Sequence, residues 1–204
     1  MNYTQLKDHI IAHTDRGDIA GSVDVFIEQA VAEINAGVRS SCMEVRASAT
    51  VSTQITNLPE DVLSLINVQN NSNSGASMPA ISLDAADKMR RDRGGAPGVP
   101  LYYSVVRKSI DVCPAPDGAY SIGLTYYQKV PVPSAAEPKN ALMTEFPNLF
   151  ITGTLKYAYD YLKEAEDYAS KSNAFSALMA EITRNHERTR FGRGAIKSRR
   201  RSYG

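Results

Sequence analysis

The sequence predicts an α+β fold in which helices at both ends of the chain flank a mostly antiparallel β-sheet, followed by an extended basic arm. Apolar residues recur at helical spacing near both ends, alternate with polar residues in the middle, and give way to clustered cations at the C-terminus. We place the helices within 3–39 and 147–187 and the β region within 44–131. Residues 1–187 form the predicted single domain, and residues 188–204 form the arm.

Two helices are predicted in the N-terminal part. The first extends from about Tyr3 to His13, where Leu6 and Ile10 have helical spacing. Ser22 is placed to cap the second helix, because a serine hydroxyl can accept a hydrogen bond from the first turn. The apolar positions of this second helix repeat at steps of three and four: Val23, Phe26, Ile27, Ala30, Val31, Ile34 and Val38.

The apolar period changes to two at Glu44, which predicts a half-buried strand. Its apolar face comprises Val45, Ala47, Ala49, Val51, Thr53 and Ile55. The next apolar run, 62–69, predicts a second strand, and we expect another short strand at 78–83. Asp84 is placed to cap a brief helix that the Gly94-Gly95 pair ends.

Three further strands, at 102–106, 109–113 and 120–128, complete the predicted sheet. The segment PAPDG between the last two combines prolines, which donate no ladder hydrogen bond, with an Asp-Gly pair that tolerates positive φ. We therefore expect a hairpin between these two strands. Tyr120, Ile122, Leu124 and Tyr126 share one face of the last strand, which suits a sheet packed on helices.

The C-terminal part predicts a linker, two helices and the arm. Residues 131–139 are punctuated by prolines, and Pro147 suits the first turn of a long helix. A final helix follows around Phe175 and Ile182. Gly192 and Gly194 then favour an extended arm over continued helix.

The net charge of +1 conceals two regions of opposite sign. Residues 184–204 hold eight basic side chains and one acidic side chain, a net charge of +7, and the other 183 residues carry 15 basic and 21 acidic side chains, a net charge of −6. Clustered cations gain mainly by meeting phosphate or an acidic protein surface. We therefore expect a partner to bind the arm.

The sequence shows no pattern typical of an enzyme. It lacks the common nucleotide-binding and hydrolase motifs, and Cys42 and Cys113 are too isolated for a disulfide framework or a zinc site. His9 and His13 have a metal-binding spacing, but no third ligand is evident, so we expect neither metal nor cofactor. No stretch is apolar enough for a membrane span. We expect a protein without catalytic residues.

The candidate partner-binding residues are the cations and large apolar side chains of the arm: Arg188, Arg190, Phe191, Arg193, Ile196, Lys197, Arg199, Arg200, Arg201 and Tyr203. Charge alone would not require Phe191, Ile196 and Tyr203, which favours an arm ordered by a partner over a solubilising end. The alternative is a nucleic-acid-binding protein whose arm contacts phosphate. For the tyrosines outside the arm, sheet and helix packing is favoured over stacking on bases.

The order of segments resembles the head-to-tail adaptor proteins of tailed bacteriophages, especially short-tailed ones. The resemblance covers nearly the whole chain and lies in the order and spacing of MNYTQLKDHI, FIEQAVAEINAGVR, RSSCMEV, NLPEDVLSL, GVPLYYSVV, IDVCPAPDGAYSIGLTYYQKVP and FPNLFITGTLKYAYDYL before a basic end. One departure is Arg107-Lys108, where related chains often have a glycine turn.

The resemblance implies a structural protein of the virion neck, assembled in the host cytoplasm. Its copies would form a ring, commonly a dodecamer, between the portal protein and tail nozzle or tail fibre proteins. Double-stranded DNA would pass through the lumen of the ring. The basic arm would then contact the portal.

Overall fold

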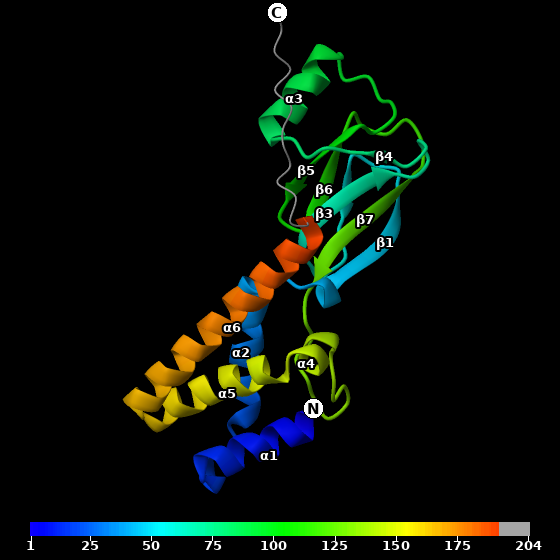
Figure 1. The fold of residues 1–204 in the computed structure, drawn as a ribbon. Coiled ribbons are helices and arrows are strands. Elements are labelled where there is room, and N and C mark those ends of the chain that lie inside the picture. Colours follow the sequence, from blue (N-terminus) through cyan, green and yellow to red (C-terminus); the bar gives the residue numbers. More distant parts are fainter. Residues whose placement is uncertain (192–204) are drawn as a thin grey trace, which may run out of the picture. The chain divides into compact units, whose positions relative to one another are not determined.

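A computed structural model describes residues 1–191 of the chain and confirms the predicted α+β class, with helices at both ends and antiparallel sheets in the middle (Figure 1). The chain divides into two compact units. We call them the helical unit, Met1–Cys42 with the chain from Val130 onward, and the β unit, Met43–Lys129. The single domain predicted over residues 1–187 thus contains two compact units.

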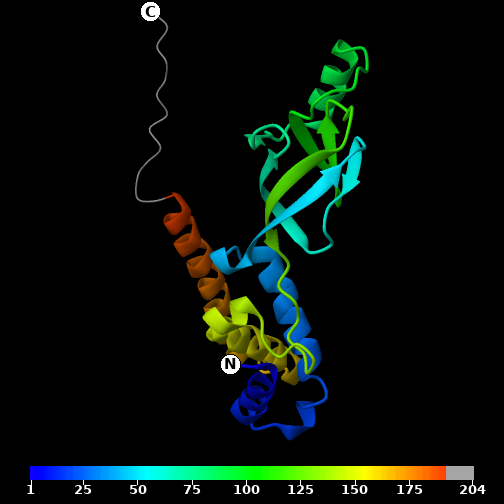
Figure 2. The ribbon, with the colours of Figure 1, turned by 90° about the vertical axis from the view of Figure 1, so that its right-hand side faces the viewer.

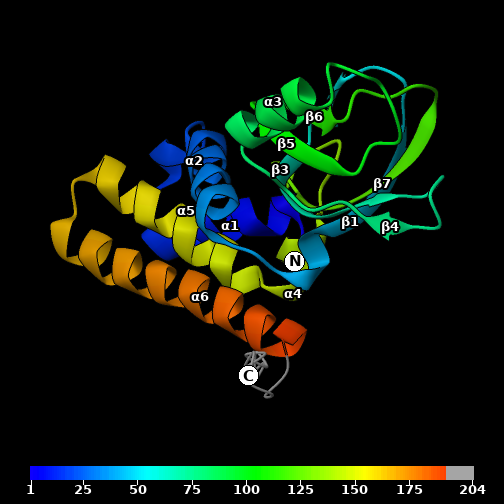
Figure 3. The ribbon, with the colours of Figure 1, turned by 90° about the horizontal axis from the view of Figure 1, so that it is seen from above.

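The helical unit is built from five α-helices in its described residues. They are α1 (Tyr3–Thr14), α2 (Val23–Gly37), α4 (Ala141–Glu145), α5 (Pro147–Leu162) and α6 (Ala165–Phe191), with a 3₁₀ turn at Gly17–Ile19. Helix α5 packs against α1, α2 and α6, and Figure 3 shows α5 and α6 side by side. The predicted helices are confirmed, whereas the short helix α4 falls just after the predicted linker.

Local signals explain where these helices begin and end. The Asn2 side chain accepts a hydrogen bond from Gln5 N, and the Gln5 side chain accepts one from Asn2 N, which forms a capping box for α1. Pro147 opens α5, as predicted. The predicted capping bond of Ser22 is wrong: the residue precedes α2, but its φ and ψ of −100° and −11° are helical, and its side chain makes no capping bond.

Helices α2, α5 and α6 approach closely around Gly153. A Cβ atom at this glycine would lie 2.7 Å from Phe175 Cε2 and 3.1 Å from Ala30 Cβ. Phe150 and Phe175 are completely buried in the same unit. The absence of a side chain at Gly153 therefore lets α5 pack against both neighbouring helices.

The β unit consists of two antiparallel sheets and one helix. The four-stranded sheet has the order β1 (Glu44–Val51), β7 (Tyr120–Gln128), β3 (Val62–Asn70) and β4 (Ala76–Ser77), and the three-stranded sheet has the order β2 (Ile55–Asn57), β6 (Ser109–Cys113) and β5 (Tyr102–Val106). Figure 2 shows the curvature of β7. A 3₁₀ turn at Ser41–Met43 precedes β1, and α3 (Leu83–Asp92) lies between β4 and β5 in sequence.

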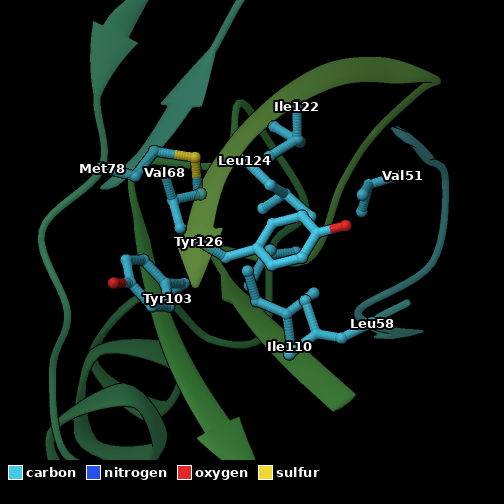
Figure 4. Close-up of a cluster of buried hydrophobic side chains, with 10 residues drawn as sticks. Val51, Leu58, Val68, Met78, Tyr103, Ile110, Ile122, Leu124 and Tyr126 are labelled. Carbon is cyan, nitrogen blue, oxygen red and sulfur yellow. The ribbon is translucent and has the colours of Figure 1, made fainter. Parts of the chain in front are cut away.

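The hydrophobic core of the β unit lies between its two sheets (Figure 4). Ile122, Leu124 and Tyr126 of β7 point into it, as their alternation predicts, and meet Tyr103 and Ile110 from the other sheet. The predicted cover of helices is therefore wrong. Alternation identifies the buried face of a strand but does not identify the element that covers it.

The hairpin predicted at PAPDG is also wrong, because β6 and β7 belong to different sheets. The prolines interrupt one sheet and the chain crosses to the other. The observed two-residue hairpin connects β5 and β6, where Val106 pairs with Ser109. Its first turn residue, Arg107, has a φ of 55°, so it adopts the left-handed conformation that glycine adopts most readily.

Two boundaries near the start of the β unit differ from prediction. The strand expected to reach Ile55 ends at Val51, and Ile55 belongs to β2 of the other sheet. Alternation continues across the break, so the period alone does not reveal it. The expected strand at 78–83 is replaced by β4, which lies earlier, and by an isolated bridge at Ala80.

Helix α3 begins earlier in the sequence than predicted. Ser82 Oγ accepts a hydrogen bond from Ala85 N, so Ser82 is the cap and Asp84 lies in the first turn. Either residue type suits a cap, and only the backbone conformation distinguishes them. Arg90 of α3 forms an ion pair with Asp111 of β6, which attaches the helix to the three-stranded sheet.

Candidate interaction surfaces

The root of the predicted arm lies on the last turn of α6. Arg188 and Arg190 are exposed there, on helix that continues to Phe191. The remaining predicted arm residues lie outside the described part of the chain: Arg193, Ile196, Lys197, Arg199, Arg200, Arg201 and Tyr203. The described residues of the arm, 188–191, thus continue α6 as helix.

A groove runs beside the C-terminal half of α6. It comprises two adjoining hollows of about 190 and 140 Å³ that share Glu145, Phe146, Ile182 and Asn185. We call it the α6 groove. Ile182 is buried, whereas Glu145 and Asn185 are exposed. The groove therefore combines an apolar floor with a polar, partly acidic rim, an arrangement typical of protein contact surfaces.

Glu145, which lines the α6 groove, interacts with the thiol of Cys42. Burial raises the pKa of the Cys42 thiol, a hydrogen bond with Ser40 opposes the rise, and the Glu145 carboxylate adds to it. The thiol is therefore held in its neutral form. This environment is the opposite of the electropositive surroundings that activate a nucleophilic cysteine.

The helical unit also contains a charge network between α2 and α5. Lys156 Nζ and the Tyr157 hydroxyl both donate to Glu33 Oε2, each over 2.7 Å. Burial opposes ionisation of Glu33, but the hydrogen bonds from Lys156 and Tyr157 outweigh it and lower its pKa. Burial and the Glu33 carboxylate raise the pKa of Tyr157. The network fixes the surface of α2 against α5.

Two of the hollows among the described residues lie on the β unit. A polar one of about 440 Å³ lies on the outer face of β1, β7 and β3 and includes Arg46, Asn67, Gln69 and Asn71. A second of about 350 Å³ lies between β3 and β5, and we call it the β3–β5 hollow. Its lining is largely apolar: Leu58, Pro59, Val62, Leu63, Leu65, Ala80, Tyr103 and Val105.

The rings of His9 and His13 stack on each other. The rings of His9 and His13 lie 6.0 Å apart at 11° between their planes, and burial, Lys171 and His9 lower the pKa of His13. Among the described residues, no group of three or more His, Cys, Asp or Glu side chains could hold a metal ion. In the same part of the chain, no helix has the length and apolar character to span a membrane.

The tyrosines mostly pack within their own units. Tyr103, Tyr126 and Tyr159 are buried, while Tyr161 is 59% exposed and contacts the ring of Phe26. Packing therefore accounts for the buried tyrosines, as the sequence favours.

Sequence reasoning missed the Glu33 network, although one signal pointed to it: Lys156 is the single cation within the apolar pattern of residues 147–162.

The α6 groove gave no such signal. Its walls come from α4, the start of α5 and the end of α6, and only their packing brings these segments together.

A protein-family model described as SU10 adaptor protein matches residues 1–199 of the chain. No curated protein matches the chain.

Proposed function

Since the chain belongs to the SU10 adaptor protein family, the head-to-tail adaptors of bacteriophages, we propose that its copies form a ring joining the portal to the tail. The family match over residues 1–199 carries this proposal. Family membership supports the general role of the chain, that of a structural protein at the head–tail junction. The proposal has three further parts. The ring is commonly a dodecamer, tail nozzle or tail fibre proteins bind its far side, and DNA passes through its lumen.

Two kinds of surface support assembly into a ring. Heterologous contacts between identical subunits require two different complementary faces on each subunit. The helical unit offers the α6 groove, and the β unit offers the β3–β5 hollow. Each unit has its own buried core.

The distribution of charge supports a channel that lets DNA slide. Residues 1–183 carry a net charge of −6, and an acidic wall repels phosphate where a basic wall would hold it. The +7 charge of residues 184–204 is then better placed against protein than against the lumen. We propose that this basic end binds the portal.

Arginine side chains suit such a contact because they form bidentate hydrogen bonds with carboxylates. Arg188 and Arg190 are exposed at the end of α6, at the root of residues 188–204. Fully extended, the 13 residues that follow Phe191 could reach about 43 Å at roughly 3.3 Å per residue. That reach would allow contact with a portal subunit beyond the ring itself.

Deletion of the gene from its phage tests the role. We expect heads that package DNA but leak it or lack tails, and we expect the chain supplied in trans to restore infectious particles. The control is deletion of a tail fibre gene, which should leave DNA-filled heads closed. Normal infectious particles without the chain would contradict the proposed function.

A further inference from the structure

The α6 groove has an apolar floor along the C-terminal half of α6. Its lining includes four large apolar side chains that are buried or half-buried: Phe146, Leu149, Leu178 and Ile182. The groove extends along the helix from Leu178 to Thr189, a length of about 17 Å at roughly 1.5 Å per residue. Its two hollows, of about 190 and 140 Å³, suit a short segment of chain that supplies a few side chains.

Two carboxylates on the rim of the groove lack a cationic partner among the described residues. Glu145 and Glu181 both line the groove, and both are exposed. None of the ion pairs formed within residues 1–191 includes either of them. Complementary charge would add to apolar contact in this groove. A matching occupant therefore combines large apolar side chains with cations.

The chain leaves α6 beside this groove. Helix α6 ends at Phe191, two residues after Thr189, which lines the groove. The 13 residues that follow, 192–204, contain five basic and no acidic side chains, and two of them are large and apolar, Ile196 and Tyr203. This segment thus has the composition that the groove requires, and it is attached to the chain at the end of the groove.

The segment is long enough to turn back along α6. Gly192 directly follows the helix, a position where glycine commonly reverses the direction of the chain. If the turn ends at Gly194, the next three residues cover about 10 Å at roughly 3.3 Å each, as much as about six residues of helix. Lys197 would then come level with Asn185, which lines the same part of the groove as Glu145.

We propose that residues 192–204 lie in the α6 groove of their own chain before assembly. Ile196 covers the apolar floor. Lys197 pairs with Glu145 or Glu181 on the rim. Attachment to α6 favours this occupant over a second copy, because a short tether raises the local concentration of the segment to about the millimolar range. The next step rests on the proposed function: the segment must leave the groove before the groove can meet a neighbouring copy and the basic end can meet the portal.

Carbodiimide crosslinking of the unmodified full-length chain tests the contact, because this reagent joins a lysine amine directly to a carboxylate with loss of water. Lys197 is the single lysine of residues 192–204. We expect mass spectrometry to find Lys197 joined to Glu145 or Glu181, in a yield that does not change with chain concentration. In an equal mixture of heavy-isotope and unlabelled chains, both halves of each joined peptide should carry the same label.

Limited cleavage by trypsin measures how often the segment leaves the groove. A chain that carries both Glu145→Gln and Glu181→Gln should be cut after Lys197 at least about threefold faster than the unmodified chain, because the segment loses its ion pairs. Glu187→Gln is the matched control and, like the double variant, adds no trypsin site. Glu187 is exposed and six residues from Glu181, so it lies on a different side of α6, and its loss should leave the cleavage rate unchanged.

Three results would overturn the proposal: Lys197 joined only to other carboxylates, joined peptides of mixed label, or equal cleavage of the double variant and the Glu187→Gln control. Mixed labels would assign the groove to the segment of a second copy. Links from Lys197 to Glu145 or Glu181 in a chain that adds no mass to portal rings would overturn only the proposed function. Rings formed on the portal by a chain that shows no such link when free would overturn only this contact.

Discussion

Lys156 Nζ lies 2.7 Å from Glu33 Oε2, so a buried cation of α5 is neutralised by a carboxylate of α2. The two partners differ in exposure: the Lys156 side chain is 10% exposed and the Glu33 side chain is 31% exposed. Lys156 Nζ also lies 5.5 Å from the ring centre of Phe175 in α6. The ammonium group therefore contacts elements from three helices, while the carboxylate keeps partial contact with water.

This asymmetry predicts that losing the carboxylate costs more than losing the cation. Glu33→Gln leaves the Lys156 charge buried without its counter-charge and should lower the free energy of unfolding by about 1–3 kcal/mol. Lys156→Met keeps the apolar stem and leaves Glu33 partly hydrated, so it should cost less. Urea unfolding followed by circular dichroism measures both, and the double variant should recover part of the loss. A greater loss from Lys156→Met would contradict this account.

The same pair predicts a loss of stability in acid. The folded state lowers the pKa of Glu33 below its ordinary value of 4.5, so the unfolded state binds the proton more readily. The contribution of the pair is complete above the unfolded pKa and is lost as the pH falls through the lower folded pKa. The urea midpoint of the unmodified chain should therefore fall more steeply in acid than that of the Glu33→Gln variant. Parallel pH profiles of the unmodified chain and the Glu33→Gln variant would contradict the assignment of this acid sensitivity to the Glu33–Lys156 pair.

The Arg107 turn predicts a stabilising substitution in the β unit. Arg107 has a φ of 55°, a conformation that costs a non-glycine residue about 1–2 kcal/mol. Arg107→Gly should raise the free energy of unfolding by about 0.5–1 kcal/mol, after the entropic cost of glycine is subtracted. Lys108→Gly is the control, because Lys108 lacks positive φ and gains nothing from glycine. Thermal unfolding of the two variants should shift in opposite directions; equal destabilisation would show that the turn is unstrained.

Much of the fold follows from periodicity. Helical spacing predicts α2 and α5, and strands β5, β6 and β7 fall within the predicted ranges because alternation and turn residues agree there. The pairing of strands does not follow in the same way. PAPDG has the composition of a hairpin turn, yet it carries the chain from one sheet to the other, since the partner of a strand is decided by contacts distant in sequence.

Less of the interaction surface follows from the sequence. Clustered charge identifies the basic end, including Arg188 and Arg190, without any knowledge of the fold. The α6 groove and the β3–β5 hollow arise where separate elements meet, and no local pattern encodes them. One unusual signal was a single residue out of place, Lys156 in an apolar helix face.

The basic end predicts a salt-dependent contact with the portal. A chain truncated after Glu187 should bind isolated portal rings more weakly than the full chain, and added salt should weaken the full chain more than the truncated one. Replacing Arg188 and Arg190 by glutamine is the matched control that keeps the length of the chain, and it should give a smaller loss. Unchanged portal affinity after truncation would contradict the contact. Retained portal binding with lost DNA binding would assign the basic end to nucleic acid.

The mass of isolated portal rings mixed with the full-length chain tests the adaptor role most directly. Light scattering should show each portal ring gaining a fixed mass, a whole number of 22.3 kDa subunits that matches one closed ring, and further chain should add nothing. Portal rings whose mass does not change in the presence of the chain, or whose mass grows without limit, would contradict the proposal that this protein forms the ring between portal and tail.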